Sequence, residues 1–239
     1  MRNQAMFSMI ALTMLVIVGC SPKYYVPNTH NVPLLEEKGQ ITLAVHGNVN
    51  QFEVQTAYGL SSNISLMVNA GFFFPADDDD GNGGSGRLGE VGLGYFTKIG
   101  EYVVFETYGL LGFGSVENNF PSSLISNPST TGKINANIFR AGIQPNIGFT
   151  SEYFSAAVSA RFISLNYSNI KGSLIFDGID QFAYLENHKS SFLVEPALTV
   201  RAGLENIKLQ AQLSGSWNLS HNNFPQENAL LSLGLFVKI

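Results

Sequence analysis

The sequence predicts an all-β fold, an antiparallel up-and-down β-barrel of about ten strands that spans a membrane. First, segments of about 8 to 16 residues with alternating apolar and polar or small side chains follow one another from Gln40 onward. Second, the links between these segments alternate between short and long. Third, 45% of the residues are hydrophobic and only 13% are charged, which is a low share of charge for a soluble protein. After the N-terminal segment, no apolar run reaches the roughly 18 to 20 residues that a spanning helix needs, so a membrane-spanning chain must form a closed barrel.

The N-terminal segment has the layout of a secretory signal, with Arg2, an apolar stretch over residues 6–18, and a small residue before the single cysteine, Cys20. The ending Ile-Val-Gly-Cys matches the lipobox pattern, and in this the segment resembles a bacterial lipoprotein signal. The resemblance implies that residues 1–19 are removed and that the Cys20 sulfur and new amine are acylated. Ser21 in place of Asp then favours export to the outer membrane. Several acyl chains, at about 0.8 kcal/mol per buried methylene, would hold the protein permanently; the alternative is an ordinary, unmodified cysteine.

Residues 20–39 are expected to form an extended, lipidated periplasmic tether, followed by a barrel over residues 40–239. Pro22, Pro27 and Pro33 block a regular helix or strand ladder in this stretch. His30 has no carboxylate or second histidine at ligand spacing, so we expect a solvated loop residue and no metal site.

The ten strand segments also set the sidedness of the barrel. They are expected at 40–47, 51–60, 64–74, 87–97, 102–114, 135–149, 153–167, 191–203, 208–219 and 229–238. Tight links lie around Ser62, Ile99, Ser151 and Glu205, and long polar links at 75–86, 115–134, 168–190 and 220–228, with 48–50 as a short exception. Membrane barrels place short turns in the periplasm and long loops outside, and an N-terminus anchored in the periplasm agrees with that order. A soluble periplasmic barrel or sandwich on a lipid tether is the alternative fold.

By this pattern, residues 40–239 resemble the small outer-membrane β-barrel superfamily of Gram-negative bacteria. The resemblance identifies an architecture and no particular member. The last segment departs from the usual terminal aromatic residue, because Phe236 stands three residues before the end.

The clearest alternation, over Lys208 to Leu219, has apolar residues on one face and polar residues on the other. With the apolar faces outward, the inward charged or titratable residues are His46, Glu53, Glu90, Glu106, Arg140, Arg161, Glu195, Arg201 and Lys238. The opposite assignment would put arginines in hydrocarbon, at about 2–4 kcal/mol each near the midplane. A selectivity lining would need charges of one sign, so mixed signs predict a network that fills the lumen and leaves it nearly closed to ions. Eight-stranded barrels are filled by side chains, and open channels appear at about 16 to 18 strands.

Short turns also predict which inward residues lie opposite each other. Three-residue turns at 61–63 and 98–100 would set Glu53 opposite Gly71, Glu106 opposite Gly92 and Glu90 opposite Tyr108. Two-residue turns at 151–152 and 205–206 would set Arg161 opposite Gly142 and Arg201 opposite Gln210. The hypothesis is that long charged side chains lie over glycine gaps.

Candidate chemistry is confined to the loops. Asp78, Asp80 and Asn82 match the opening of a calcium-binding loop. Gly89, however, stands at the position of the carboxylate that would close the site, and Glu90 comes one residue too late. A solvated acidic loop tip is therefore favoured over calcium binding. Enzymatic barrels exist in the superfamily, with catalytic residues at the outer rim. The rim candidates here are His188, His221, Asp77, Asp177 and Asp180, which share no local motif. No catalytic residue and no cofactor other than the lipid is therefore assigned.

The remaining expectations concern partners. A net charge of −5 with scattered basic residues gives no footprint for nucleic acid. Outer-membrane lipid is the expected partner of what is expected to be a monomer. Loops 115–134 and 168–190 are the expected sites of an extracellular ligand, the second either as a docking surface or as a packed lid. Three functions stay open: a structural or surface-recognition barrel, a narrow transporter of small or apolar solutes, and a rim hydrolase.

Overall fold

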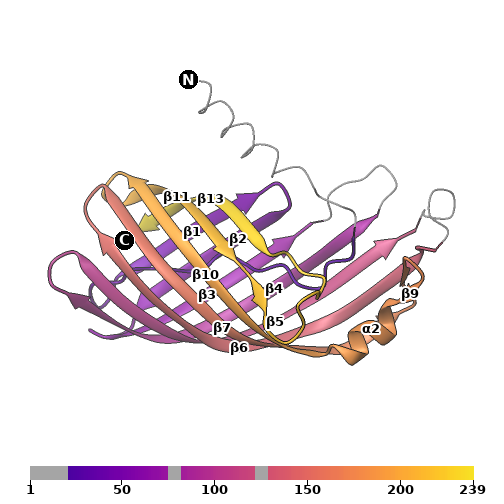
Figure 1. Ribbon diagram of the computed structural model, residues 1–239. Coiled ribbons are helices and arrows are strands. Elements are labelled where there is room, and N and C mark those ends of the chain that lie inside the picture. Colours follow the sequence, from indigo (N-terminus) through magenta and orange to yellow (C-terminus); the bar gives the residue numbers. More distant parts are fainter. Residues whose placement is uncertain (1–20, 75–81, 122–128) are drawn as a thin grey trace, which may run out of the picture.

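The computed structural model describes residues 21–74, 82–121 and 129–239, and these form a closed antiparallel barrel (Figure 1). The sheet contains eleven strands, of which the short β12 continues β11, so ten strands form the wall. The wall closes because β1 pairs with β2 on one side and with β13 on the other. The wall strands are β1 (Ile41–Asn48), β2 (Gln51–Gly59), β3 (Ile64–Phe73), β4 (Gly83–Ile99), β5 (Val103–Phe120), β6 (Gly132–Thr150), β7 (Phe154–Gly172), β10 (Ser190–Gly203), β11 (Ile207–Gly215) with β12 (Trp217–Asn218), and β13 (Ala229–Lys238). The predicted fold class is confirmed.

Side chains alternate between the lumen and the outer face along each wall strand. In β1, for example, Thr42, Ala44 and His46 are buried, whereas Ile41, Leu43 and Val45 are exposed. The outer face carries large apolar side chains, such as Leu209, Leu213 and Leu233, which are all more than half exposed. An apolar belt on the outside of a closed barrel requires hydrocarbon around it. Among the described residues, no helix is long and apolar enough to cross a membrane.

The wall is uneven in height. β1, β2 and β3 have 8, 9 and 10 residues, whereas β5, β6 and β7 have 18, 19 and 19. The sequence-based prediction ended the long strands too early on the loop side. Residues 115–120 and 132–134, expected to be loop, continue the ladder between β5 and β6. The barrel therefore has one low side and one tall side at the end that carries its long loops.

Two of the predicted turns were wrong, and the register differs accordingly. Glu53 does face Gly71, and Arg201 does face Gln210. However, β4 and β5 join through Gly100, Glu101 and Tyr102, where Gly100 adopts the left-handed φ of +71° that this turn needs.

As a result, Glu106 faces Phe96 and Glu90 faces Gly112, neither of which was predicted. Between β6 and β7 the turn is also longer, because the Ser151 N–H donates to Phe154 O at 2.8 Å. Gly142 then faces Ile163 and not Arg161. All these shifts are by an even number of residues, so the inward faces stay inward.

Candidate functional site: a luminal strap and its polar network

Residues 21–39, which we call the strap, run through the lumen of the barrel. Residues 22, 24–25 and 27–35 are buried, and the segment forms no wall strand. The extended conformation agrees with the prediction, but the expectation of a solvated tether outside the barrel is wrong. His30, expected in solvent, is 1% exposed and its Nδ1 lies 2.7 Å from Ser159 Oγ.

The strap passes from one end of the barrel to the other. At the short-turn end, where the turns after β2, β4, β6 and β10 lie, the Gly39 N–H donates to Gly59 O at 2.8 Å. At the opposite, long-loop end, the Tyr24 N–H donates to Pro225 O and the Glu227 N–H donates to Tyr25 O, at 2.8 and 2.9 Å. Between these two ends the strap pairs with no wall strand, so its backbone groups there must find side-chain partners, and the lumen supplies these.

Charged wall residues provide one set of partners. The Glu53 carboxylate accepts from the Thr29 N–H at 2.9 Å and from its hydroxyl at 2.6 Å. Glu106 Oε1 accepts from the Leu35 N–H at 2.9 Å. Arg161 donates to Asn28 O and Thr29 O at 3.0 and 2.8 Å, and Arg201 donates to Val32 O at 2.6 Å. The predicted luminal charges thus bind the strap more than they bind one another.

Glutamines provide a second set, which the sequence reasoning missed. Gln212 pairs with both backbone groups of His30, accepting from N–H at 2.6 Å and donating to C=O at 2.9 Å. Gln55 donates to Thr29 O at 2.9 Å, and Gln144 donates to Asn31 O at 2.7 Å. A glutamine amide offers both a donor and an acceptor, so on the wall it replaces a neighbouring strand. Their inward positions were readable from the alternation, but the segment that they bind was not.

Two ion pairs complete the network. Arg140 contacts Glu90 at 2.5 Å and Arg161 approaches Glu195 at 3.8 Å, with all four side chains fully buried. Tyr25 connects the two pairs, because its hydroxyl donates to Glu195 at 2.9 Å and accepts from Arg140 at 2.8 Å. Buried ion pairs are weak stabilisers once desolvation is counted, so their main effect is to fix the position of the strap.

His46 and Lys238 are the other predicted luminal residues. His46 is buried and both ring nitrogens lie 3.3 Å from Gln210 Nε2. Lys238 lies at the short-turn end, where it pairs with Glu36 of the strap. Lys98 also pairs with Glu36, at 2.9 Å. Burial raises the pKa of the Glu36 carboxyl, but the two ammonium groups outweigh it and hold that pKa below its usual value.

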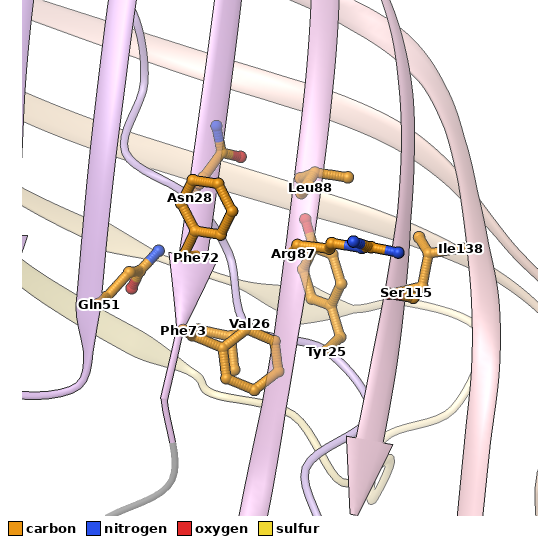
Figure 2. A pocket seen from close by; sticks show the side chains of 11 residues that line it. Tyr25, Val26, Asn28, Gln51, Phe72, Phe73, Arg87, Leu88, Ser115 and Ile138 are labelled. Carbon is orange, nitrogen blue, oxygen red and sulfur yellow. The ribbon is translucent and has the colours of Figure 1, made fainter.

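The short-turn mouth contains an open cavity of about 310 Å³. Its lining includes Glu36, Glu101, Glu152 and Glu205 with only two lysines. On the loop side, a cavity of about 20 Å³, room for about one water, separates the strap from the wall. Figure 2 shows Tyr25 and Val26 of the strap beside Phe73 and Arg87 there.

A lid, which we define as residues 173–189, packs over the strap at the long-loop end. It contains the hairpin β8 (Ile175–Phe176) and β9 (Ile179–Asp180) and the helix α2 (Gln181–Asn187). Leu174 and Leu185 are fully buried, and the Tyr24 hydroxyl of the strap donates to Gln181 Oε1 at 2.9 Å. This matches the packed-lid expectation for loop 168–190.

The structure brings together only some of the rim candidates. His188 and His221 stack edge to face with ring centroids 4.6 Å apart, and their nitrogens lie near the carbonyls of Tyr184 and Ser190, at 2.6 and 3.2 Å. Asp180 instead caps α2, accepting from two backbone N–H groups. Asp177 contacts Thr130. The contacts observed for Asp177 and Asp180 are thus with groups other than these two histidines.

Several predicted residues lie outside the described residues, namely Cys20, Asp77, Asp78 and Asp80. Asn82 lies directly before β4. Across residues 21–74, 82–121 and 129–239, no group of three or more His, Cys, Asp or Glu residues is placed to hold a metal ion.

Comparison with known proteins gives only distant likenesses. No family model matches the chain, and no curated protein matches it. Among solved structures, the chain is similar to a KdgM porin, with 7% identity, a TM-score of 0.36, and coverage of 83% of this chain and 98% of that one. It is also similar to LpxR from Salmonella typhimurium, with 8% identity, a TM-score of 0.37, and coverage of 84% and 99%. At this distance neither likeness carries an argument about function.

Proposed function

We propose that this protein is an outer-membrane β-barrel, lipidated on Cys20, whose lumen is closed to ions by its own strap. Its role is structural or one of surface recognition through the long-loop end. The observation that carries the proposal is the course of the strap, which fills the lumen from Gly39 at one mouth to Tyr24 at the other.

The closure rests on polar contacts along the whole length of the lumen. A ten-stranded wall is wider than the eight-stranded barrels that their own side chains fill. Here the extra space holds a second backbone, and that backbone binds the charged and amide side chains that would otherwise line a water path. Permeation would require the strap to leave and these buried groups to lose their partners, at about 1–3 kcal/mol for each unsatisfied group. This argues against a constitutive transporter.

Single-channel recording tests the closure directly. The purified full-length protein in planar bilayers should show no stable openings of porin-like size. Long-lived, porin-like openings of the wild type would overturn the proposal, because they require a water path that the strap blocks.

Lipidation is tested separately. Radiolabelled palmitate should enter the wild type and should not enter a Cys20→Ala variant. Equal labelling of both, or none in the wild type, would remove the lipid from the proposal and leave the closed barrel intact.

Surface recognition is proposed for the long-loop end because loops on a rigid scaffold commonly carry binding. The lid presents exposed Ile179 and Phe182 there, above a well-packed base. Among the described rim candidates, the contacts observed for Asp177 and Asp180 are with groups other than the two histidines, so these contacts lend the hydrolase alternative no support.

A further inference from the structure

The direction of the strap has a consequence for the N-terminus. From Gly39 at the short-turn end, the strap reaches Tyr24 at the long-loop end, after passing the full lumen. We infer that the N-terminal end of the mature chain, and with it a lipid on Cys20, emerges on the extracellular side of the outer membrane. The lipid and the sidedness rest on the proposed function. The expected periplasmic tether would place both on the opposite side.

The N-terminal residues of the strap are held at the long-loop end. Lys23 and Asn118 of β5 exchange two hydrogen bonds of 2.9 Å, one from the Lys23 N–H and one to the Lys23 carbonyl. The Lys23 ammonium lies 3.6 Å from Glu227. These contacts join the strap to the tall wall and to the loop before β13, so the end is not turned back into the lumen. Ser21 is exposed beyond them.

The chain before Lys23 can extend only a short distance from this mouth before it reaches Cys20. Cys20 is bonded to Ser21, and consecutive Cα atoms are about 3.8 Å apart. From Val26, Cys20 is six residues away, so the two are separated by at most about 22 Å at roughly 3.3–3.6 Å per residue. Any group on Cys20 therefore stays near the long-loop mouth.

The low side of the wall borders the strap at the long-loop end. Val26 lies beside Phe73, at the loop-side end of β3, and Gln51, at the loop-side end of β2, lines the same pocket (Figure 2). This rim is apolar outside: Val49, in the turn between β1 and β2, is 97% exposed, and Phe52 and Phe72 point outward. Outward aromatic residues are typical of a rim at the membrane interface.

Cysteine accessibility on intact cells tests this sidedness. Cys20 is the only cysteine, and the proposed lipidation would consume its thiol, so the wild type is the background control. Lys23→Cys and Lys38→Cys place a thiol at the two ends of the strap, and Glu227→Cys marks the long-loop end of the barrel itself. Substitution at Ser21 is avoided because, by resemblance to lipoprotein signals, that residue is expected to favour export to the outer membrane.

A membrane-impermeant maleimide should label Lys23→Cys and Glu227→Cys on intact cells, and Lys38→Cys only after the outer membrane is permeabilised. If Glu227→Cys is labelled on intact cells but Lys23→Cys is labelled only after permeabilisation or denaturation, the inference is wrong and the orientation of the barrel stands. If both are labelled only after permeabilisation, the proposed orientation fails and the inference fails with it. Labelling of Lys38→Cys on intact cells would also overturn it.

Discussion

Gly112 offers the sharpest test of how tightly the polar network is packed. It lies inward on β5, opposite Glu90 on one side and Arg140 on the other. A methyl group here would lie 2.9 Å from Arg140 Cγ and 3.1 Å from Arg140 Nε. The arginine cannot move aside cheaply, because its guanidinium is held by Glu90, Tyr25 and Asn28.

Gly112→Ala should therefore lower the free energy of unfolding by about 1–3 kcal/mol, the usual cost of overpacking. The cost rises toward about 3–5 kcal/mol if the ion pair with Glu90 breaks. Gly109→Ala is the matched control on the same strand. It is exposed, and its added carbon would meet only Leu93 O at 3.8 Å. That change should stabilise the strand by about 0.5–1 kcal/mol, since glycine weakens a strand interior.

Urea unfolding in lipid vesicles, read as the shift of barrel migration in unheated gels, gives both values. The two variants should move the midpoint in opposite directions. Equal midpoints, or a Gly112→Ala variant as stable as the wild type, would show that Arg140 is not confined as the structure indicates.

Three further perturbations probe the strap and the lid. Tyr25→Phe removes a hydroxyl shared by two buried charged groups and should cost about 1–3 kcal/mol in urea unfolding, while Tyr153→Phe at an exposed turn should change nothing measurable. Glu36 has a pKa below its ordinary value of 4.5, so the stabilisation that its carboxylate gives is present above pH 4.5 and is lost as the pH falls through the lowered pKa. The urea midpoints of the wild type and of Glu36→Gln should therefore converge at acid pH. A constant difference between the two midpoints down to the most acid pH would contradict this. Asp180→Ala removes the N-cap of α2 and should destabilise the helix by about 0.5–2 kcal/mol. Proteolysis of the lid should then be faster, while the urea midpoint of the barrel stays unchanged. An unchanged proteolysis rate would argue against the cap.

The wall was predictable because its signal repeats every two residues. Apolar residues outside and polar residues inside can be read from residues such as Leu209 and Gln210 without any knowledge of turn length. Register was less predictable, because it depends on how many residues each turn uses. The turn at Gly100 needs a left-handed glycine, which placed it two residues later than expected.

The strap was not predictable from its own residues. Three prolines and no periodicity are equally consistent with a solvated chain and with a segment that side chains hold inside a barrel. The signal lay in the wall instead: Gln55, Gln144 and Gln212 point inward, where an amide needs both a donor and an acceptor. The luminal ion pairs cannot satisfy all the donors and acceptors of these amides. A ten-stranded lumen has room for a second backbone that can.

The central claim, that the strap lies inside the barrel, is tested most directly by hydrogen exchange of the unmodified sequence in a membrane. The N–H groups of Thr29, His30 and Leu35 are buried and donate to Glu53, Gln212 and Glu106. Peptides covering residues 28–35 should therefore exchange as slowly as peptides from the wall strands. Exchange of this segment at the rate of a solvated chain, while the wall strands stay protected, would contradict the account.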